Sequence, residues 1–301
     1  MTTSPQFDVD ILEIRKHYDR LSRFYRMLWG EHLHHGYWEN GESIERAQIR
    51  LMEQLAEKAR IQRGARVLDI GCGLGGSAFW LADQYDCRVT GLTISPVQAR
   101  MATKKAKAKQ LADRIQFLVT DANAWQPEPE SVDVVWIMES SEHFRGKKNF
   151  FERCATALKR GGVLAVCAWL RGEQSASDRH QELVATIGRA MFSASLDTLS
   201  QYAAWMREAN LEVETALDIT KNVAPTWEHC FRMAQRLKLN WLVHLADAPT
   251  RHFVQSFPLM TQAYANGAMA FGLFVARKPI PTDNCSSRDE STGADSSSQA
   301  H

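Results

Sequence analysis

The stretch of sequence that decides the fold is Val67–Ala82, which reads VLDIGCGLGGSAFWLA. A short apolar run comes first, four glycines follow it, and an amphipathic run closes the stretch. Glycine is needed where the backbone turns sharply and where a ligand approaches it closely. The stretch therefore predicts a strand, a tight turn and a helix, with a cofactor lying over the glycines.

Around this stretch, β-rich segments alternate with helical patterns. We expect strands at Arg66–Ile70, Arg88–Leu92, Ile115–Val119, Val132–Met138, Val163–Trp169, Leu211–Ile219 and Ala270–Ala276. Helical patterns occur at Ser43–Ile61, Ser77–Gln84, Pro96–Leu111, Asn149–Leu158 and Leu196–Asn210. This alternation predicts an α/β fold with a doubly wound, mostly parallel, seven-stranded Rossmann-like sheet.

The remaining segments suggest a cover and a tail. The segment before the last strand is too long and too rich in apolar and aromatic residues for a solvated loop, so we expect a helical lid. The expected division is an N-terminal helical cover (1–42), the cofactor-binding core (43–220), the lid insertion (221–267), the final core strand (268–278) and a tail (279–301). The tail is rich in Ser, Asp and Thr, which predicts disorder.

Composition excludes several classes of partner. The chain has 301 residues, 45% of them apolar, and a net charge of +1, so no polyanionic partner such as nucleic acid is expected. No apolar run approaches the roughly 18 residues of a membrane span, and no signal peptide is apparent, so we expect a soluble cytoplasmic protein. The six cysteines form no C-x-x-C pair and are interpreted as buried thiols. Nothing indicates an oligomeric state.

The glycine spacing alone does not identify the cofactor. Gly71, Gly73 and Gly76 satisfy the dinucleotide pattern G-x-G-x-x-G. A dinucleotide site also expects an acid about 20 residues on, at the end of the second strand, where this chain has Thr93 and no acid. Asp69, just before the loop, suits a cofactor with a positively charged end. An NAD-dependent oxidoreductase and a silent nucleotide-binding protein remain alternatives of other classes.

Several motifs together resemble those of one family. VLDIGCGLGG (67–76) resembles the first motif of class I S-adenosylmethionine-dependent methyltransferases, whose glycine loop holds the methionine and ribose parts of the cofactor. VTGLTISPVQ (89–98) resembles the second-strand motif of the branch that includes tocopherol methyltransferases, rebeccamycin-type sugar O-methyltransferases and cyclopropane fatty acid synthases. WIMESSEHF (136–144) is similar to the strand-4 motif of the tocopherol-type enzymes, and HYDRLSRFYRMLWGEHLHHGYWE (17–39) is also similar to this branch.

The resemblance implies S-adenosyl-L-methionine as the cofactor and a set of residues that contact it. That set is Asp69, Gly71, Gly73, Gly75, Thr93, Gln98, Asp121, Ala122, Glu139, Tyr18 and Tyr37. The alternatives are a simple turn for the glycines and ordinary amphipathic packing for the two tyrosines. Ser95 can act at the cofactor or cap the next helix.

The expected chemistry lies just after the fourth strand, at the carboxyl edge of the sheet. His143 and Glu142 are the candidate catalytic base, and we expect only one of the two to face the reacting atom because adjacent residues point in different directions. His32, His34 and His35 could bind zinc. No nearby cysteine supports zinc, so we expect no metal and interpret these histidines as cofactor or substrate contacts, or as surface residues.

The function implied by the resemblance is methyl transfer to a small, apolar or aromatic metabolite, as in C- or O-methylation of natural products in secondary metabolism. A cyclopropane-synthase-like lipid-modifying enzyme is the alternative within the branch. Those synthases use an N-terminal cysteine with a strand-4 glutamate to hold bicarbonate. No cysteine lies between residues 1 and 71, which argues against cyclopropanation, although Glu142 stands in the matching place.

Overall fold

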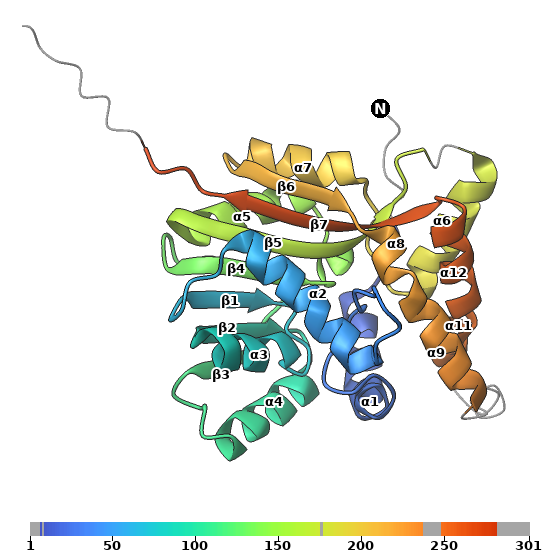
Figure 1. Ribbon diagram of the computed structural model, residues 1–301, viewed down its shortest axis with the longest axis horizontal. Helices are drawn as coiled ribbons and strands as arrows, with labels where there is room; N and C mark the ends of the chain where they lie inside the picture. The colour runs from blue at the N-terminus through green and yellow to red at the C-terminus, as the bar shows by residue number, and fades with distance from the viewer. Residues whose placement is uncertain (1–6, 8, 175–176, 237–247, 282–301) are drawn as a thin grey trace, which may run out of the picture.

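A seven-stranded sheet forms the centre of the protein. The computed structural model describes residues 7, 9–174, 177–236 and 248–281. The strands are β1 (Arg66–Ile70), β2 (Arg88–Thr93), β3 (Ile115–Val119), β4 (Val132–Met138), β5 (Leu158–Arg171), β6 (Glu212–Asp218) and β7 (Met269–Arg277). Their order is β3-β2-β1-β4-β5-β7-β6; β7 pairs antiparallel with β5 and β6, and the other neighbouring strands pair parallel (Figure 1). The expected doubly wound, mostly parallel sheet is confirmed.

Helices cover both faces of this sheet because successive side chains of a strand point to opposite faces. On one face, α2 (Ile44–Ala59) and α3 (Gly76–Tyr85) pack with Val67 and Val134. On the other face, α5 (Lys147–Ala157) and α7 (Leu199–Glu208) pack with Leu68 and Val135. Helix α4 (Pro96–Ala108) packs along β2 and β3 at one end of the sheet.

The helix starts follow from local sequence. The Ser43 hydroxyl accepts the Arg46 backbone N–H at the start of α2. Ser95 caps α4 in the same way, with Pro96 at the first helical position, which agrees with the capping alternative. Thr198 starts α7 with a capping box.

A second group of helices lies beyond the carboxyl ends of the parallel strands (Figure 1). It consists of α1 (Ile11–Trp29), α6 (Asp178–Ala190), α8 (Thr220–Val223), α9 (Pro225–Arg236), α11 (Ala248–Gln255) and α12 (Phe257–Ala265). The described part of the expected lid is helical, whereas residues 237–247 of it lie outside the described residues, as does the expected tail from residue 282 onwards. Helix α6 was not expected from the sequence.

Strand β5 begins five positions before the predicted Val163. Gly161 lies in a bulge inside the strand, where the register with β4 shifts and Gly161 has a φ of +75°. The bulge persists because Lys278 pairs with it: Gly161 donates its N–H to the Lys278 carbonyl, and Lys278 donates to the Gly162 carbonyl.

Two general expectations concern the thiols and the membrane. Cys72, Cys87, Cys154, Cys167 and Cys230 are buried and free, while Cys285 lies outside the described residues. Within the described part of the chain, none of the helices combines the length and the apolar composition that a membrane-spanning segment needs.

Candidate active site

The glycine turn after β1 is shaped by close contact with the end of β4. Gly71 and Gly73 have φ values of +79° and +53°, in the region that glycine tolerates best. A Cβ at Gly71 would overlap the side chain of Ser140. Ser140 is itself fixed, because its hydroxyl donates to the Ile70 carbonyl at 2.6 Å. The turn therefore requires glycine at position 71 and leaves its backbone open to a ligand.

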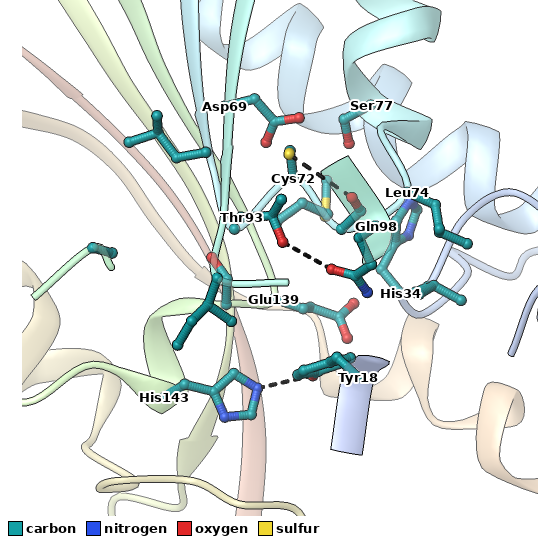
Figure 2. A pocket seen from close by; sticks show the side chains of 18 of the residues that line it. Tyr18, His34, Asp69, Cys72, Leu74, Ser77, Thr93, Gln98, Glu139 and His143 are labelled. Atoms are coloured by element: carbon teal, nitrogen blue, oxygen red, sulfur yellow. Dashed lines mark hydrogen bonds between the residues drawn. The ribbon is translucent and has the colours of Figure 1, made fainter. Parts of the chain in front are cut away.

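A first cavity lies over this turn, at the carboxyl ends of β1, β2 and β4. It encloses about 990 Å³ of space, including its open mouth. Of the residues predicted from the sequence, it is lined by Tyr18, Asp69, Gly71, Gly73, Thr93, Gln98, Asp121, Ala122, Glu139 and His143. Figure 2 shows how the labelled side chains from α1, β1, β2 and the β4 end surround one hollow.

Four side chains that line the first cavity carry a buried polar atom without a hydrogen-bond partner: His32, His34, Asp69 and Gln98. The Asp69 carboxyl is 1% exposed and its Oδ2 has no hydrogen bond, and burial raises its pKa to about 7. Gln98 accepts from the Thr93 hydroxyl at 2.8 Å, but its Nε2 has no acceptor. Because buried polar groups are normally paired, these atoms indicate a polar ligand. An ammonium group suits Asp69 and a hydroxyl suits Gln98, so the amino-acid and ribose parts of S-adenosylmethionine fit this cavity.

The far wall of the first cavity is a short turn after β3. Asp121 Oδ1 accepts from the backbone N–H and the side-chain amide of Asn123, at 2.8 and 3.0 Å. This turn fixes the position of Ala122, which is buried and also lines the cavity.

A second cavity of about 770 Å³ adjoins the first. Five residues line both cavities and are called the shared wall below: Tyr18, Leu33, His34, Glu139 and His143. The other residues of the second cavity are His17, His35, Glu142, Trp169, Met191, Phe192, Ser193, Thr226, Trp227 and Cys230. They come from α1, the segment before α2, β5, the end of α6 and α9.

His143 in the shared wall is a neutral base. Its Nδ1 lies 2.8 Å from the Phe192 carbonyl, which can only accept, so Nδ1 carries the proton. Its Nε2 therefore has a free lone pair, which accepts from the Tyr18 hydroxyl at 3.1 Å (Figure 2). Burial lowers the pKa of His143, so the imidazole stays unprotonated near neutral pH.

Glu139 in the shared wall is a fully bonded carboxylate. It accepts the His35 backbone N–H, the His35 Nδ1–H and the Trp169 Nε1–H, each at 2.7 Å. Burial raises the pKa of Glu139, but the interactions with His35, His34 and Trp169 together outweigh that effect, and the pKa ends below its usual value. The backbone of Glu139 has a φ of +52°, an unfavourable conformation that often marks a functional site.

Glu142 lines the second cavity. Its Oε1 accepts the Trp169 backbone N–H at 2.5 Å, while its Oε2 has no partner. Burial raises the pKa of Glu142 to about 8. Glu142 and His143 both line the second cavity from the 3-10 turn Ser141–His143, and which of the two faces the reacting atom stays a prediction.

Two predicted residues line neither of these cavities. Tyr37 packs against the hydrophobic core, and Gly75 begins α3 in a left-handed conformation. Of the three histidines, His34 lies in the shared wall with its Nε2 unpartnered, His32 lines the first cavity, and His35 is bonded to Glu139. Among the residues that the structure describes, no three His, Cys, Asp or Glu side chains gather as metal ligands would.

Other lining residues were missed from the sequence. Cys72, Leu74 and Ser77 lie within the glycine stretch itself, so their position beside the glycines was a usable signal. Met191 and Phe192 carried no comparable signal, because they follow α6, a helix that was not expected.

Known proteins share this architecture and sequence. Residues 6–257 match the family described as mycolic acid cyclopropane synthetase. The chain is 33% identical to the 27-O-demethylrifamycin SV methyltransferase of Amycolatopsis mediterranei, over 89% of this chain and 97% of that one. It is 29% identical to the chloroplastic tocopherol O-methyltransferase of Arabidopsis thaliana, over 89% and 82% of the two chains.

A solved structure carries the same fold. The geranyl diphosphate C-methyltransferase of Streptomyces coelicolor, in complex with Mg²⁺, geranyl diphosphate and S-adenosyl-L-homocysteine, superimposes with a TM-score of 0.67 at 20% identity, covering 89% of this chain and 97% of that one. The matched family sets aside the oxidoreductase alternative. The chain belongs to the mycolic acid cyclopropane synthetase family and is an S-adenosylmethionine-dependent methyltransferase.

Proposed function

We propose that this methyltransferase transfers a methyl group to a hydroxyl of a small, mostly apolar metabolite that occupies the second cavity. The observation that carries the proposal is the shared wall, where the lone pair of His143 Nε2 lies between the cofactor cavity and the second cavity. A base at that position can take a proton from an acceptor hydroxyl as the oxygen attacks the methyl carbon.

The lining of the second cavity supports an apolar or aromatic acceptor. The side chains of Trp169, Trp227, Met191 and Phe192 present large apolar surfaces, and the histidine, glutamate, serine and threonine residues of the same lining offer partners for polar groups of the acceptor. The two relatives named above are a rifamycin and a tocopherol methyltransferase, which agrees with acceptors of this kind and with a role in secondary metabolism.

The residues divide the work between binding and proton transfer. The bound cofactor supplies an electrophilic methyl group on a sulfonium. Asp69 would hold the cofactor ammonium, and Thr93 with Gln98 would hold its ribose. Fixing donor and acceptor in line can supply about 7–11 kcal/mol of the barrier reduction.

Proton transfer then uses the two hydrogen bonds of the His143 imidazole. The acceptor hydroxyl takes the place of the Tyr18 hydroxyl on His143 Nε2 and gives it a proton as the ether forms. The Phe192 carbonyl keeps its bond to Nδ1–H and thereby stabilises the imidazolium. General base catalysis of this kind contributes roughly 10²–10⁴-fold.

A cyclopropane-synthase-like activity is the second candidate. The observation that favours it is the buried Glu142 carboxyl with one unpartnered oxygen, at the position where such enzymes carry a glutamate. The apolar side chains of the second cavity also suit a lipid chain, so the reaction product has to be analysed to distinguish O-methylation from cyclopropanation.

Product analysis tests the proposal. The purified enzyme would be incubated with S-adenosylmethionine and either a panel of phenols, quinols and macrocyclic alcohols or unsaturated phospholipids. We expect S-adenosylhomocysteine to form with hydroxyl-bearing acceptors and mass spectrometry to identify a methyl ether. A cyclopropanated acyl chain, or a methylated carbon without any ether, would overturn the proposal.

A further inference from the structure

The free oxygen of Glu142 is a polar group that the mechanism above does not use. Glu142 is 2% exposed, and its Oε1 is held by the Trp169 backbone N–H. This bond occupies one carboxyl oxygen and leaves Oε2 buried without any hydrogen bond, on a side chain that lines the second cavity. A buried oxygen without a hydrogen-bond partner destabilises the protein unless a ligand forms a hydrogen bond with it.

The charges around Glu142 oppose an ionised carboxyl. Glu139, on the adjoining end of β4, is already an anion. Lys147 on α5 favours the ionised form, but it is buried and bonded to the Ser195 carbonyl at 3.0 Å and to Asp197 Oδ2 at 2.8 Å. The ammonium charge is therefore largely neutralised by Asp197.

The other titratable groups near Glu142 leave no unpaired positive charge: His35 is bonded to the Glu139 carboxylate at 2.7 Å, and the groups named next are uncharged. His143, on the same turn, is neutral. Tyr18 from α1, Cys167 from β5 and Tyr202 from α7 have raised pKa values because they are buried and because Glu142 is near them. His34, on the opposite wall of the second cavity, is also buried with a lowered pKa. Each of these groups is therefore uncharged near neutral pH, which favours the protonated form of Glu142.

We propose that Glu142 is a protonated carboxylic acid that donates a hydrogen bond from Oε2 to a second oxygen of the acceptor. The acceptor class is then a hydroxyl-bearing carbonyl compound: a hydroxyketone, hydroxyquinone or hydroxylactone with an apolar frame. The inference rests on the proposed function, because it assigns the second cavity to the acceptor. It differs from the expectation that Glu142 acts as a base, since a carboxyl group that is already protonated cannot accept the proton of the acceptor.

Two groups of opposite character then fix the orientation of the acceptor. His143 Nε2 accepts from the hydroxyl to be methylated, and Glu142 Oε2 donates to the carbonyl. A molecule that lacks the carbonyl leaves the Glu142 proton unpaired, so the site discriminates against it strongly. These two hydrogen bonds thereby select which hydroxyl of the acceptor lies in line with the methyl group.

The protonation state can be measured without a substrate. Infrared spectra of the S-adenosylhomocysteine-bound protein would be compared between the wild type and E142Q at neutral pH. We expect the difference spectrum to contain the carbonyl stretch of a protonated carboxylic acid, which converts to carboxylate bands as the pH is raised beyond about 8. Carboxylate bands alone at neutral pH would overturn the inference, whatever the enzyme methylates.

The role in recognition is tested with matched probes and two variants. The probes are the positional isomers of hydroxytetralone, a bicyclic phenol with a ring ketone, and tetrahydronaphthol, which lacks only the ketone. Calorimetry on the S-adenosylhomocysteine-bound wild type is expected to show at least roughly tenfold tighter binding of one ketone isomer. E142Q, whose amide still donates, keeps that preference, whereas E142L, similar in size but apolar, loses it.

The outcomes separate the inference from the proposed function. Equal affinities for all probes, or a preference lost equally in E142Q and E142L, would contradict the donor role. Methyl ether formation in the product analysis would stand in either case. Melting temperatures of both variants with S-adenosylhomocysteine check that the second cavity stays folded.

Discussion

At the scale of single residues, the protonation of Asp69 is the property that we expect to depend most on a bound ligand. Its pKa lies near 7 in the ligand-free protein because the carboxyl is buried, compared with an ordinary value of 3.8. The folded state therefore binds a proton more tightly than the unfolded chain does. Asp69 opposes folding increasingly as the pH rises from about 4 to 7, and its effect is constant above that range.

Cofactor binding should reverse this effect. The ammonium of S-adenosylhomocysteine favours the carboxylate, so binding releases a proton below pH 7. We expect calorimetry to show affinity that rises with pH up to about 7 and then levels off. D69N should bind at least tenfold more weakly and with little pH dependence in this range, whereas D113N, at an exposed position, should behave as the wild type. A D69N protein that keeps the wild-type pH profile would remove Asp69 from the ammonium site.

His143 carries the next prediction. H143A should lower kcat by roughly 10²–10³-fold, because the proton acceptor is lost, while its affinity for S-adenosylhomocysteine changes little. Because burial lowers the pKa of His143, the wild-type activity should fall on the acid side only below the ordinary histidine pKa of 6.5. Methyl transfer measured across pH checks both statements. Unchanged turnover in H143A would show that another group accepts the proton.

The sequence predicted the residues of the first cavity better than those of the second cavity. Asp69, Gly71, Thr93 and Gln98 lie at strand ends whose positions follow from local patterns, and parallel strands bring these ends together. Phe192, by contrast, reaches the second cavity only through the packing of α6 against α12. A position that depends on packing between distant helices cannot be predicted from the local sequence.

At the scale of elements, the glycine turn allows a matched test. Gly71 and Gly64 have nearly equal φ values of +79° and +76°, but a Cβ at Gly64 would meet nothing within 4 Å. G64A should therefore cost only the backbone penalty, about 1–2 kcal/mol. G71A should cost more and weaken S-adenosylhomocysteine binding at least tenfold, because the new Cβ pushes Ser140 away. Denaturation and calorimetry on both variants compare them. Equal losses in the two variants would show that the contact with Ser140 is unimportant.

The segment before α2 is tied to the lid through Thr226 of α9. The Thr226 hydroxyl accepts from the Gly36 backbone N–H at 3.0 Å and from Trp38 Nε1–H at 2.8 Å. T226V keeps the shape but leaves both donors unpaired, so we expect a loss of about 1–3 kcal/mol in unfolding free energy. T186V, whose hydroxyl bonds only to its own helix, is the control. A T226V protein as stable as T186V would mean that water satisfies the two donors.

At the scale of the whole molecule, the sheet and the cover have separate tasks. The sheet brings the glycine turn, Thr93 and Glu139 to one edge, and its topology was predictable because alternating strands and helices admit few arrangements. The cover closes the second cavity with residues from α1, the end of α6 and α9. The position of the cover depends on long-range contacts such as Tyr264 to His35, at 3.2 Å, which no local pattern encodes.

The central claim is that methyl transfer occurs across the shared wall between the two cavities. A crystal structure of the protein with S-adenosylhomocysteine tests it most directly. The account predicts the homocysteine amine at Asp69 and the thioether sulfur facing the shared wall, with the second cavity open on the other side. A cofactor whose sulfur points away from Tyr18 and His143 would contradict the account.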